Sequence, residues 1–245
     1  MSEEAKDEKF LSYEHQGVID SGGIEIKNLN YEIDKNIILD KININIKPGE
    51  KVAFVGSLGC GKSSLLKCIV GFNTVENNSI LIDGYDINSI SPDILRKNIG
   101  YSPQAIQLFA GTIYDNVGMG KDNFKDEEIE RACEIVGIKN FIGKLPGGYN
   151  YVLDERGRNL SGGQKKSFVL ARALIKEPKI LVLDEPTSSM DSATINNFIN
   201  NLMKVYQDYT VIIATHSAQD LSLVDRVIVL NNGQVAEDCS KQEFI

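Results

Sequence analysis

The sequence has no tryptophan, only two histidines, and no apolar run that approaches the roughly 18 residues needed to span a bilayer. Its first ten residues are mostly charged, which argues against a signal peptide. Lysine and arginine (26) are outnumbered by aspartate and glutamate (34), so the net charge is −8. Because nucleic-acid binding requires a basic face, this acidity argues against nucleic acid as the main partner.

Cysteine is also scarce. The four cysteines form neither a C-x-x-C pair nor a metal-binding spacing, and they are Cys60, Cys68, Cys133 and Cys239. We therefore expect reduced thiols in a cytosolic protein. Hydrophobic residues make up 42% and charged residues 24% of 245 positions, which suits one large α/β domain or two lobes around a buried core.

The chain is organised around a glycine-rich stretch, residues 56–63, with the sequence Gly-Ser-Leu-Gly-Cys-Gly-Lys-Ser. It follows a short apolar run at 52–55, typical of a buried strand, and precedes a helical pattern at 64–70 that ends at Gly71. Strand, glycine loop and helix are the context in which G-x-x-x-x-G-K-[ST] binds phosphate. A chance surface turn is the alternative, and the flanking segments argue against it.

A triphosphate brings negative charge against the backbone, and glycines allow several N–H groups to point inward. The positive end of the following helix adds to this attraction. We expect Lys62 to reach the β and γ oxygens and the Ser63 hydroxyl to hold Mg²⁺. The predicted nucleotide-binding residues of this loop are Gly56, Ser57, Gly59, Cys60, Gly61, Lys62, Ser63 and Ser64.

Cys60 allows two interpretations. Its place near a helix N-terminus would lower the pKa of the thiol, and alkylation would then block nucleotide binding. Alternatively it is a small residue that fits the loop, which is the interpretation we favour.

The remaining pattern predicts three parts. Residues 1–23 are polar and are expected to form a linker or chain end, and residues 24–245 form the domain. Isoleucines two residues apart, at 24–26 and 42–46, predict half-buried strands of an antiparallel layer beside a parallel core. Residues from about 105 to 176 are expected to form an inserted helical lobe, with Asp126 as an N-cap.

Two carboxylates follow an apolar strand at residues 180–184. Asp184 and Glu185 stand at its carboxyl end, where open α/β sheets bind ligands. A Mg²⁺–triphosphate site needs one carboxylate near the metal and a second group that orients water, which suits Asp184 and Glu185 respectively. His216 follows the end of a further buried strand, 211–214, and is expected beside the γ-phosphate. Solvated acids and a structural histidine are the alternatives.

A second glycine turn, residues 160–164, leads into a helix. Its hydroxyl and backbone N–H groups are suited to bind another anion at a helix N-terminus. The first loop needs no second anion site in the same chain, so a site shared between two subunits is suggested. The expected ligands are Ser161, Gly162, Gly163 and Gln164.

Together these stretches resemble the ATP-binding cassette (ABC) family from residue 24 onward. Residues 56–63 are similar to its Walker A motif, Gln104 to its Q-loop glutamine, 160–164 to its signature and 180–184 to its Walker B motif. Glu185 resembles the catalytic glutamate, 188–191 the D-loop and His216 the switch histidine.

The resemblance implies a P-loop NTPase (RecA-like) fold with a parallel sheet, an antiparallel β subdomain and an inserted helical subdomain. It implies binding of ATP and Mg²⁺, with Ser63, Gln104 and Asp184 at the metal and with Glu185, His216 and Gln104 in catalysis. It also implies a head-to-tail dimer, expected to be a homodimer, that sandwiches two ATP molecules.

A further stretch resembles exporters. Glu155-Arg156-Gly157 is similar to the X-loop that contacts transmembrane domains, although Asp154 stands where that motif usually has glycine. The sequence most resembles type I secretion and peptide exporters. This resemblance implies membrane helices elsewhere in the protein and a location at the cytoplasmic face of the inner membrane. Type I secretion also implies a membrane fusion protein and an outer-membrane channel. The resemblance also implies that the contacts to the cargo lie in those membrane helices.

One position departs from the family. The aromatic residue that stacks on adenine falls at Ile33, and Tyr31 lies two residues earlier. Tyr31 is the candidate substitute, and the alternative is weak stacking, which predicts modest ATP affinity and little discrimination against GTP.

Other functions remain as alternatives. They are a small-molecule or lipid ABC exporter, an importer subunit, a regulatory module without turnover, and a soluble ABC ATPase of DNA repair or translation. The sequence lacks the long coiled coil of repair members and the second cassette of translation members.

Overall fold

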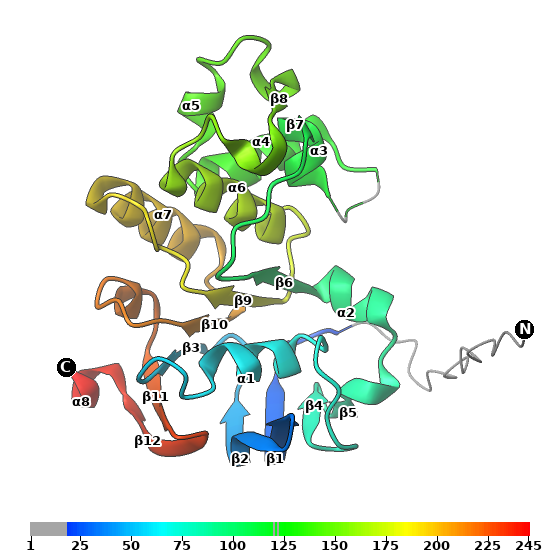
Figure 1. Cartoon of the computed structure of the whole chain (residues 1–245), viewed down its shortest axis with the longest axis vertical. Coiled ribbons are helices and arrows are strands. Elements are labelled where there is room, and N and C mark those ends of the chain that lie inside the picture. Colours follow the sequence, from blue (N-terminus) through cyan, green and yellow to red (C-terminus); the bar gives the residue numbers. More distant parts are fainter. Residues whose placement is uncertain (1–18, 120, 122) are drawn as a thin grey trace, which may run out of the picture.

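The computed structural model describes residues 19–119, 121 and 123–245. Most of the predicted linker, residues 1–18, lies outside the described residues. Figure 1 shows an antiparallel sheet at the bottom, a larger sheet across the middle and a helical lobe at the top, with helix α1 (Lys62–Ile69) between the two sheets.

The central sheet has six strands within the described chain, in the order β12-β11-β3-β10-β9-β6. Neighbouring strands are parallel except for β11 and β12, which form a hairpin. The bounds are β3 (Lys51–Val55), β6 (Ile99–Ser102), β9 (Ile180–Asp184), β10 (Thr210–Ala214), β11 (Arg226–Asn231) and β12 (Gln234–Ser240).

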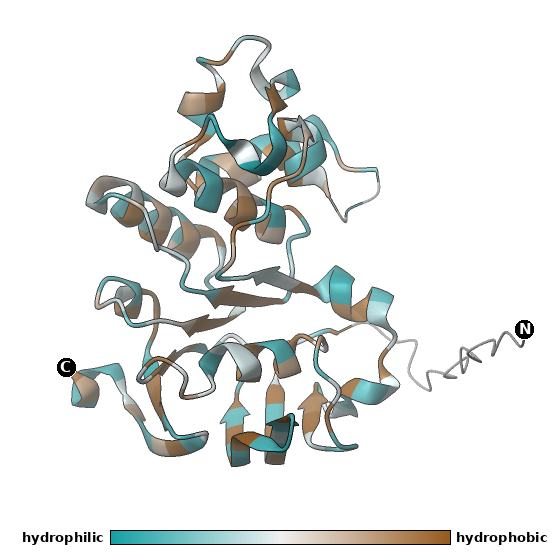
Figure 2. Cartoon of the chain, in the orientation of Figure 1, coloured by the Kyte–Doolittle hydropathy of each residue, from teal (hydrophilic) through white to brown (hydrophobic). Residues whose placement is uncertain are grey.

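The inner strands are buried on both faces, as their continuous apolar sequences predict. In β3, Val52 and Phe54 pack toward α1 and the antiparallel sheet, whereas Ala53 and Val55 pack toward the helical lobe. The same alternation runs through β9 and β10, which are brown in Figure 2. The central sheet therefore separates two hydrophobic cores.

The antiparallel sheet is confirmed. Its strand order is β2-β1-β4-β5, with β1 (Ile24–Ile33), β2 (Asn36–Ile46), β4 (Ile80–Ile82) and β5 (Tyr85–Asp86). Ile24 pairs with Ile46 and Ile26 with Ile44, and all four side chains are buried. Helix α2 (Pro92–Asn98) begins after the N-cap Ser91 and connects this sheet to β6.

Residues 19–23 are packed against this sheet. Ile19 is 2% exposed, and the Asp83 carboxylate accepts hydrogen bonds from the backbone N–H groups of residues 20–23 and from the Ser21 hydroxyl. Burial acts to raise the pKa of Asp83, but these hydrogen bonds outweigh it and hold the pKa below its usual value. The chain is thus anchored before residue 24, at which we placed the domain boundary.

The helical lobe contains α3 (Ile113–Gly118), α4 (Asp126–Ile135), α5 (Lys139–Ile142) and α6 (Gly162–Leu174). A two-stranded sheet, β7 (Gly111–Thr112) with β8 (Val152–Leu153), was not expected within it. The N-cap of α4 is Lys125, not Asp126, because the Glu128 carboxylate accepts the Lys125 N–H at 2.9 Å and fixes the helix start one residue earlier.

Helix α7 (Ser192–Val205) lies between the helical lobe and the central sheet, and the short α8 (Lys241–Phe244) follows β12. Asp191 caps α7 as expected, accepting the Thr194 N–H at 3.0 Å. No helix in the described ranges combines the length and the apolar character that crossing a membrane requires.

Candidate functional site

The glycine loop of residues 56–63 connects β3 to α1. Gly56 is required by packing, because a Cβ there would collide with the Leu230 carbonyl oxygen and would lie 2.7 Å from Cys60 Sγ. Gly61 has φ 106°, and a Cβ there would lie 2.8 Å from Leu39 Cδ2. The loop is therefore clamped between β2 and β11. Ser57 and Gly59 are exposed at its tip, and Ser64 lies in the first turn of α1.

Lys62 folds back over this loop. Its Nζ donates to the Gly56 carbonyl at 2.7 Å and to the Ser57 carbonyl at 3.0 Å. Both acceptors are neutral, so the ammonium charge has no carboxylate partner among these hydrogen bonds. A cation held by backbone oxygens at the start of a helix fits a phosphate group.

Cys60 is 4% exposed, and its Sγ lies 3.6 Å from Lys62 Nζ. All four cysteines are free, as expected. The burial of Cys60 beneath the loop favours the packing interpretation over a reactive thiol.

Asp184 ends β9 and is 3% exposed. Burial raises the pKa of Asp184, and a hydrogen bond from the Ser63 hydroxyl acts in the opposite direction. Two of the three predicted Mg²⁺ ligands are thus in direct contact. One carboxylate and one hydroxyl are enough protein ligands for Mg²⁺, because this ion usually takes its remaining ligands from water and from phosphate oxygens. The described residues contain no cluster of three or more His, Cys, Asp or Glu side chains suited to a metal ion.

Gln104, the third predicted ligand, is exposed in the segment after β6. The preceding residue is tied to Asp184 through Lys166 of α6, whose Nζ donates to the Pro103 carbonyl at 3.0 Å and to the Asp184 carbonyl at 2.9 Å. Burial lowers the pKa of Lys166 to about 8, and the Asp184 carboxylate opposes this shift. The Gln104 segment therefore lies beside the end of β9.

Glu185 and His216 are joined directly. His216 Nδ1 lies 2.8 Å from Glu185 Oε1, and the glutamate side chain is 13% exposed against 73% for the histidine. An ionised carboxylate only accepts hydrogen bonds, so Nδ1 carries the proton in this pair. The contact places two of the three predicted catalytic groups together at the carboxyl ends of β9 and β10.

The backbone of Glu185 adopts φ 48°, in the left-handed region. Its N–H donates to the Ala214 carbonyl at 2.8 Å, and its carbonyl accepts from the Ser188 hydroxyl at 3.0 Å. A non-glycine residue in this region costs about 1–3 kcal/mol, so the surrounding contacts hold Glu185 in a strained position typical of functional sites.

Three supporting residues were missed by the sequence reasoning. Thr215 donates to the Asp220 carboxylate at 2.6 Å and accepts the Ser217 N–H at 2.9 Å, which fixes the turn that carries His216. Burial raises the pKa of Asp220, which is 1% exposed. Lys166 is the third, and its only signal in the sequence is its helical spacing from the apolar residues of α6.

The second glycine turn begins α6. Ser161 Oγ accepts the Gln164 N–H at 3.2 Å, and Gln164 Oε1 accepts the Ser161 N–H at 2.9 Å. A Cβ at Gly162 would lie 3.1 Å from Ser189 Cβ, and one at Gly163 would lie 2.9 Å from the Ser189 carbonyl oxygen. Figure 1 places α6 in the upper lobe and α1 below the central sheet, so the two turns belong to different lobes.

The β1–β2 hairpin lies against the glycine loop through Leu39, the cross-strand partner of Tyr31. Tyr31 is half-buried against the core that contains α1, whereas Ile33 is 45% exposed. The aromatic face of Tyr31 is thus partly occupied by its own chain.

The chain was compared with known proteins. A family model described as "ABC transporter" matches residues 39–188. The α-hemolysin translocation ATP-binding protein HlyB of Proteus vulgaris is 38% identical over 227 residues, covering 92% of this chain and 32% of HlyB. The leukotoxin translocation ATP-binding protein LktB of Mannheimia glucosida is 36% identical over 226 residues, covering 91% of this chain and 32% of LktB. This chain thus spans about a third of the length of these relatives.

A solved structure of a bacterial Atm1-family ABC exporter with ATP bound is also similar. It is 32% identical with a TM-score of 0.88, and the match covers 93% of this chain and 40% of the exporter chain. The fold predicted from the motifs, a P-loop NTPase core with an antiparallel sheet and a helical subdomain, is therefore confirmed. The match of the family model to more than half of the residues agrees with it, and this chain belongs to the ABC transporter family.

Proposed function

We propose that this chain is the ATP-hydrolysing domain of an ABC exporter of the type I secretion kind, which couples ATP-driven dimerisation to export of a protein or peptide. The contact between Glu185 and His216, beside the Ser63–Asp184 pair, carries this proposal. A module that only binds nucleotide would have no need for a carboxylate and an imidazole held together at this point.

Each residue has a distinct role in the proposed reaction. Lys62 and the loop N–H groups bind the β and γ phosphates. Glu185 orients the attacking water and accepts its proton, and His216 Nδ1–H holds the carboxylate in place while Nε2 faces the γ-phosphate. Since the 2.8 Å contact already exists in the single chain, the pair is preorganised before ATP arrives.

Ser63, Asp184 and Gln104 would hold Mg²⁺. When bound, the ion neutralises charge that develops on the β and γ oxygens. The chain contributes a buried carboxylate, a hydroxyl that already contacts it, and an exposed amide on a neighbouring segment.

The complete site requires a second copy of the chain. We infer a head-to-tail homodimer in which Ser161, Gly162, Gly163 and Gln164 of one copy contact the ATP held by residues 56–63 of the other. The position of the two turns in different lobes supports this arrangement. The N–H groups of Gly162 and Gly163 have no intrahelical acceptor at the start of α6 and are suited to phosphate oxygens.

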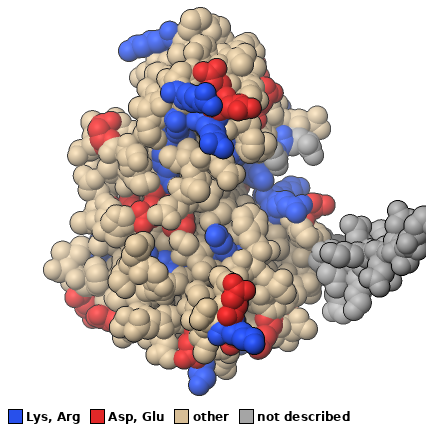
Figure 3. Space-filling model, in the orientation of Figure 1, with Lys and Arg blue, Asp and Glu red and all other residues tan. Residues whose placement is uncertain are grey.

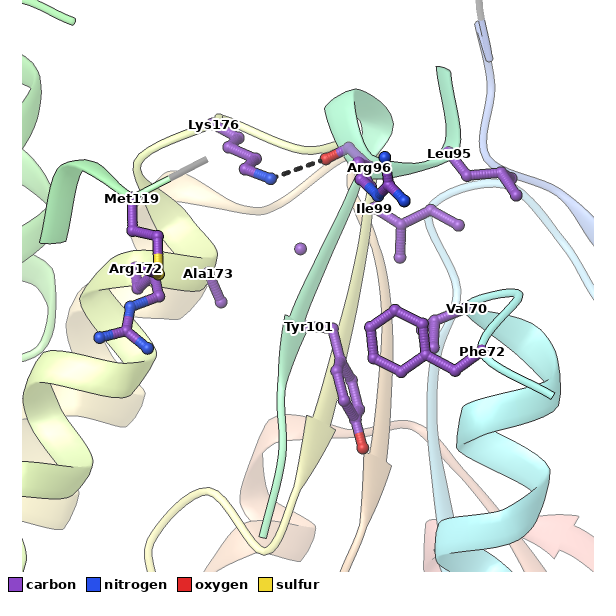
Figure 4. A pocket seen from close by; sticks show the side chains of 11 residues that line it. Val70, Phe72, Leu95, Arg96, Ile99, Tyr101, Met119, Arg172, Ala173 and Lys176 are labelled. Atoms are coloured by element: carbon purple, nitrogen blue, oxygen red, sulfur yellow. Dashed lines mark hydrogen bonds between the residues drawn. The ribbon is translucent and has the colours of Figure 1, made fainter. Parts of the chain in front are cut away.

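A groove between the lobes is the proposed contact for the transmembrane domain of the same exporter. It has a volume of about 260 Å³. Figure 4 shows Phe72 and Tyr101 on one side and Met119 on the other, with the bond between Lys176 and the Arg96 carbonyl above. Phe72 is 63% exposed and meets the Tyr101 ring edge-on at 5.4 Å. Burial and then the Arg96 charge lower the pKa of Lys176, so an incoming carboxylate would be favourable here.

The cytoplasmic face of the membrane is the location that this role implies. The relatives are named as toxin translocation proteins, which supports a membrane fusion protein and an outer-membrane channel as further partners. The exposed Glu155 and Arg156 of the predicted X-loop are suited to a second contact with the transmembrane domain. On the face drawn in Figure 3, basic side chains are interspersed with acidic ones.

The test is Mg²⁺-dependent release of phosphate from ATP by the purified chain. Lys62→Met removes charge-assisted phosphate bonds of roughly 1.5–3 kcal/mol, so ATP affinity should fall about 10- to 100-fold. Absence of hydrolysis at high protein concentration, where a dimer can form, would contradict the proposed function.

A further inference from the structure

Lys166 is a lysine in the interior of the protein. It lies on α6 in register with Val169, Leu170 and Ala173, and its side chain is 0% exposed. Burial of an ammonium group is costly unless hydrogen bonds compensate for the lost water. An apolar residue of similar length would fill the same space without this cost.

The hydrogen bonds of Lys166 join two functional segments. One goes to the Pro103 carbonyl, immediately before Gln104, and the other to the Asp184 carbonyl, immediately before Glu185. The two acceptors are 63 and 18 residues away in the sequence. A single side chain of the helical lobe therefore fixes the backbone that leads to Gln104 and the backbone that leads to Glu185.

Helix α6 also holds the Gln104 segment at a second point, through Arg172. Arg172 donates to the Gln107 carbonyl at 3.0 Å and to the Asn116 carbonyl at 2.7 Å, and it lies over the Phe109 ring at 5.4 Å. Asn116 in turn accepts the Phe109 N–H at 3.0 Å. Residues 103–109 are thus held by α6 at both ends, and they must follow α6 when the helical lobe moves.

We propose that Lys166 is a positioning residue for ATP hydrolysis, which sets the Gln104 segment and the Asp184–Glu185 backbone relative to each other according to the placement of α6. This inference rests on the proposed ATP hydrolysis. When α6 is placed correctly, as in a closed dimer, both segments are in register. When α6 is displaced, Lys166 displaces the backbone next to Gln104 and Glu185, the residues proposed to act on Mg²⁺ and on water.

The experiment replaces Lys166 by methionine, which keeps the length and apolar stem but removes both hydrogen bonds. Lys51→Met is the matched control, because Lys51 is a 7% exposed lysine whose Nζ donates to the carbonyls of Gln207 at 2.7 Å and Gly49 at 3.4 Å. Lys51 starts β3, at the end of the central sheet opposite to Glu185.

We expect Lys166→Met to lower kcat by about 10- to 100-fold, the scale of a small misplacement of reacting groups, with ATP affinity within about threefold of the parent. Lys51→Met should lower the melting temperature without changing kcat. If the role of Lys166 were purely structural, both variants would lose stability and neither would lose kcat. An unchanged kcat in folded Lys166→Met would therefore overturn the proposal. A parent protein without turnover would instead contradict the proposed function.

A double-mutant cycle tests the route through Gln104. If Lys166 acts through this segment, Lys166→Met combined with Gln104→Ala should lose no more turnover than the larger single loss. Multiplied losses would exclude this route.

A second measurement keeps the native lysine and applies even if Lys166→Met does not fold. Since the chain has no tryptophan, Phe109→Trp places a single tryptophan at the Arg172 end of this segment. In this variant, which keeps Lys166, the wavelength of tryptophan emission should shift when Mg-ATP is added at a concentration that drives dimerisation. An unchanged emission under these conditions would overturn the proposal.

Discussion

The two glycine turns of this chain, residues 56–63 and 161–164, have the same local design and different surroundings. Each leads into a helix whose first N–H groups have no intrahelical acceptor. The first turn contains its own cation, Lys62, and lies next to the Ser63–Asp184 contact. The second turn contains no lysine, and its glycines are explained by close packing against Ser189.

This difference shows which turn can act alone. The first turn supplies charge, backbone donors and metal ligands within one chain, so it is suited to bind a triphosphate in the monomer. The second supplies the start of a helix and a hydroxyl that already caps it. A helix N-terminus without a cation binds an anion weakly, so the second turn is suited to complete a site built by another chain.

The largest effect is expected for Glu185→Gln, which should reduce ATP turnover without reducing ATP binding at the first turn. Glu185→Gln keeps the shape and removes the proton acceptor, so kcat should fall by about 10²- to 10⁴-fold while ATP still binds. Glu177→Gln, at an exposed pair with Arg131, is the control and should turn over normally. Steady-state hydrolysis and ATP titration measure both, and normal turnover in Glu185→Gln would refute the assigned role.

The second turn can be disabled without loss of its helix. Ser161→Asp retains an N-cap, as Asp191 does for α7, but places a negative charge where the partner's phosphate is expected. ATP-driven dimerisation should weaken by about 100-fold, and ATP binding by the monomer should be unchanged.

Ser91→Asp, at the N-cap of α2, is the control for this substitution. Its ATP-driven dimerisation should match that of the parent. Equal dimerisation of the parent and Ser161→Asp would mean that the second turn does not face phosphate.

A third prediction concerns the stability of the lobe that holds the first turn. Because the pKa of Asp83 is lower in the folded than in the unfolded chain, its ionised form stabilises the fold above the unfolded value near 3.8, and this contribution is lost as pH falls through the folded pKa. Asp83→Asn should lower the free energy of unfolding at pH 7 by about 1–2 kcal/mol. Urea titrations should show this difference narrowing below about pH 4, and a difference independent of pH would contradict the hydrogen-bonded carboxylate.

The last prediction concerns recognition of the nucleotide base, for which the parent should show the smallest difference. With Ile33 exposed and Tyr31 half-buried, ATP and GTP should bind the first turn with affinities within about threefold. Ile33→Tyr should tighten both, because base stacking on an aromatic ring is worth roughly 1–3 kcal/mol for any base. Strong discrimination against GTP by the parent would show that a base-reading group has been missed.

Local patterns predicted most of the fold. The strand at residues 180–184, the alternating isoleucines and the Asp191 cap depend on neighbours in the sequence, so each was correctly predicted. The first glycine loop was placed between a strand and a helix for the same reason. The helix after it starts at Lys62, two residues before the predicted start.

The contacts that organise the site were not predicted. Lys166 bonds to carbonyl groups 63 and 18 residues away, and a carbonyl acceptor leaves no trace in the sequence because every residue has one. Ile19 was assigned to the linker because its neighbours are polar, yet it is buried in the core. Such contacts depend on tertiary packing, which overrides local composition.

The most direct test of a shared site is the solution mass of Glu185→Gln with and without Mg-ATP. Because this variant should bind ATP without consuming it, the closed state should accumulate. We expect a monomer of 27.1 kDa that becomes a dimer when Mg-ATP is added. A variant that binds ATP and remains a monomer at high protein concentration would contradict a site formed by two copies of this chain.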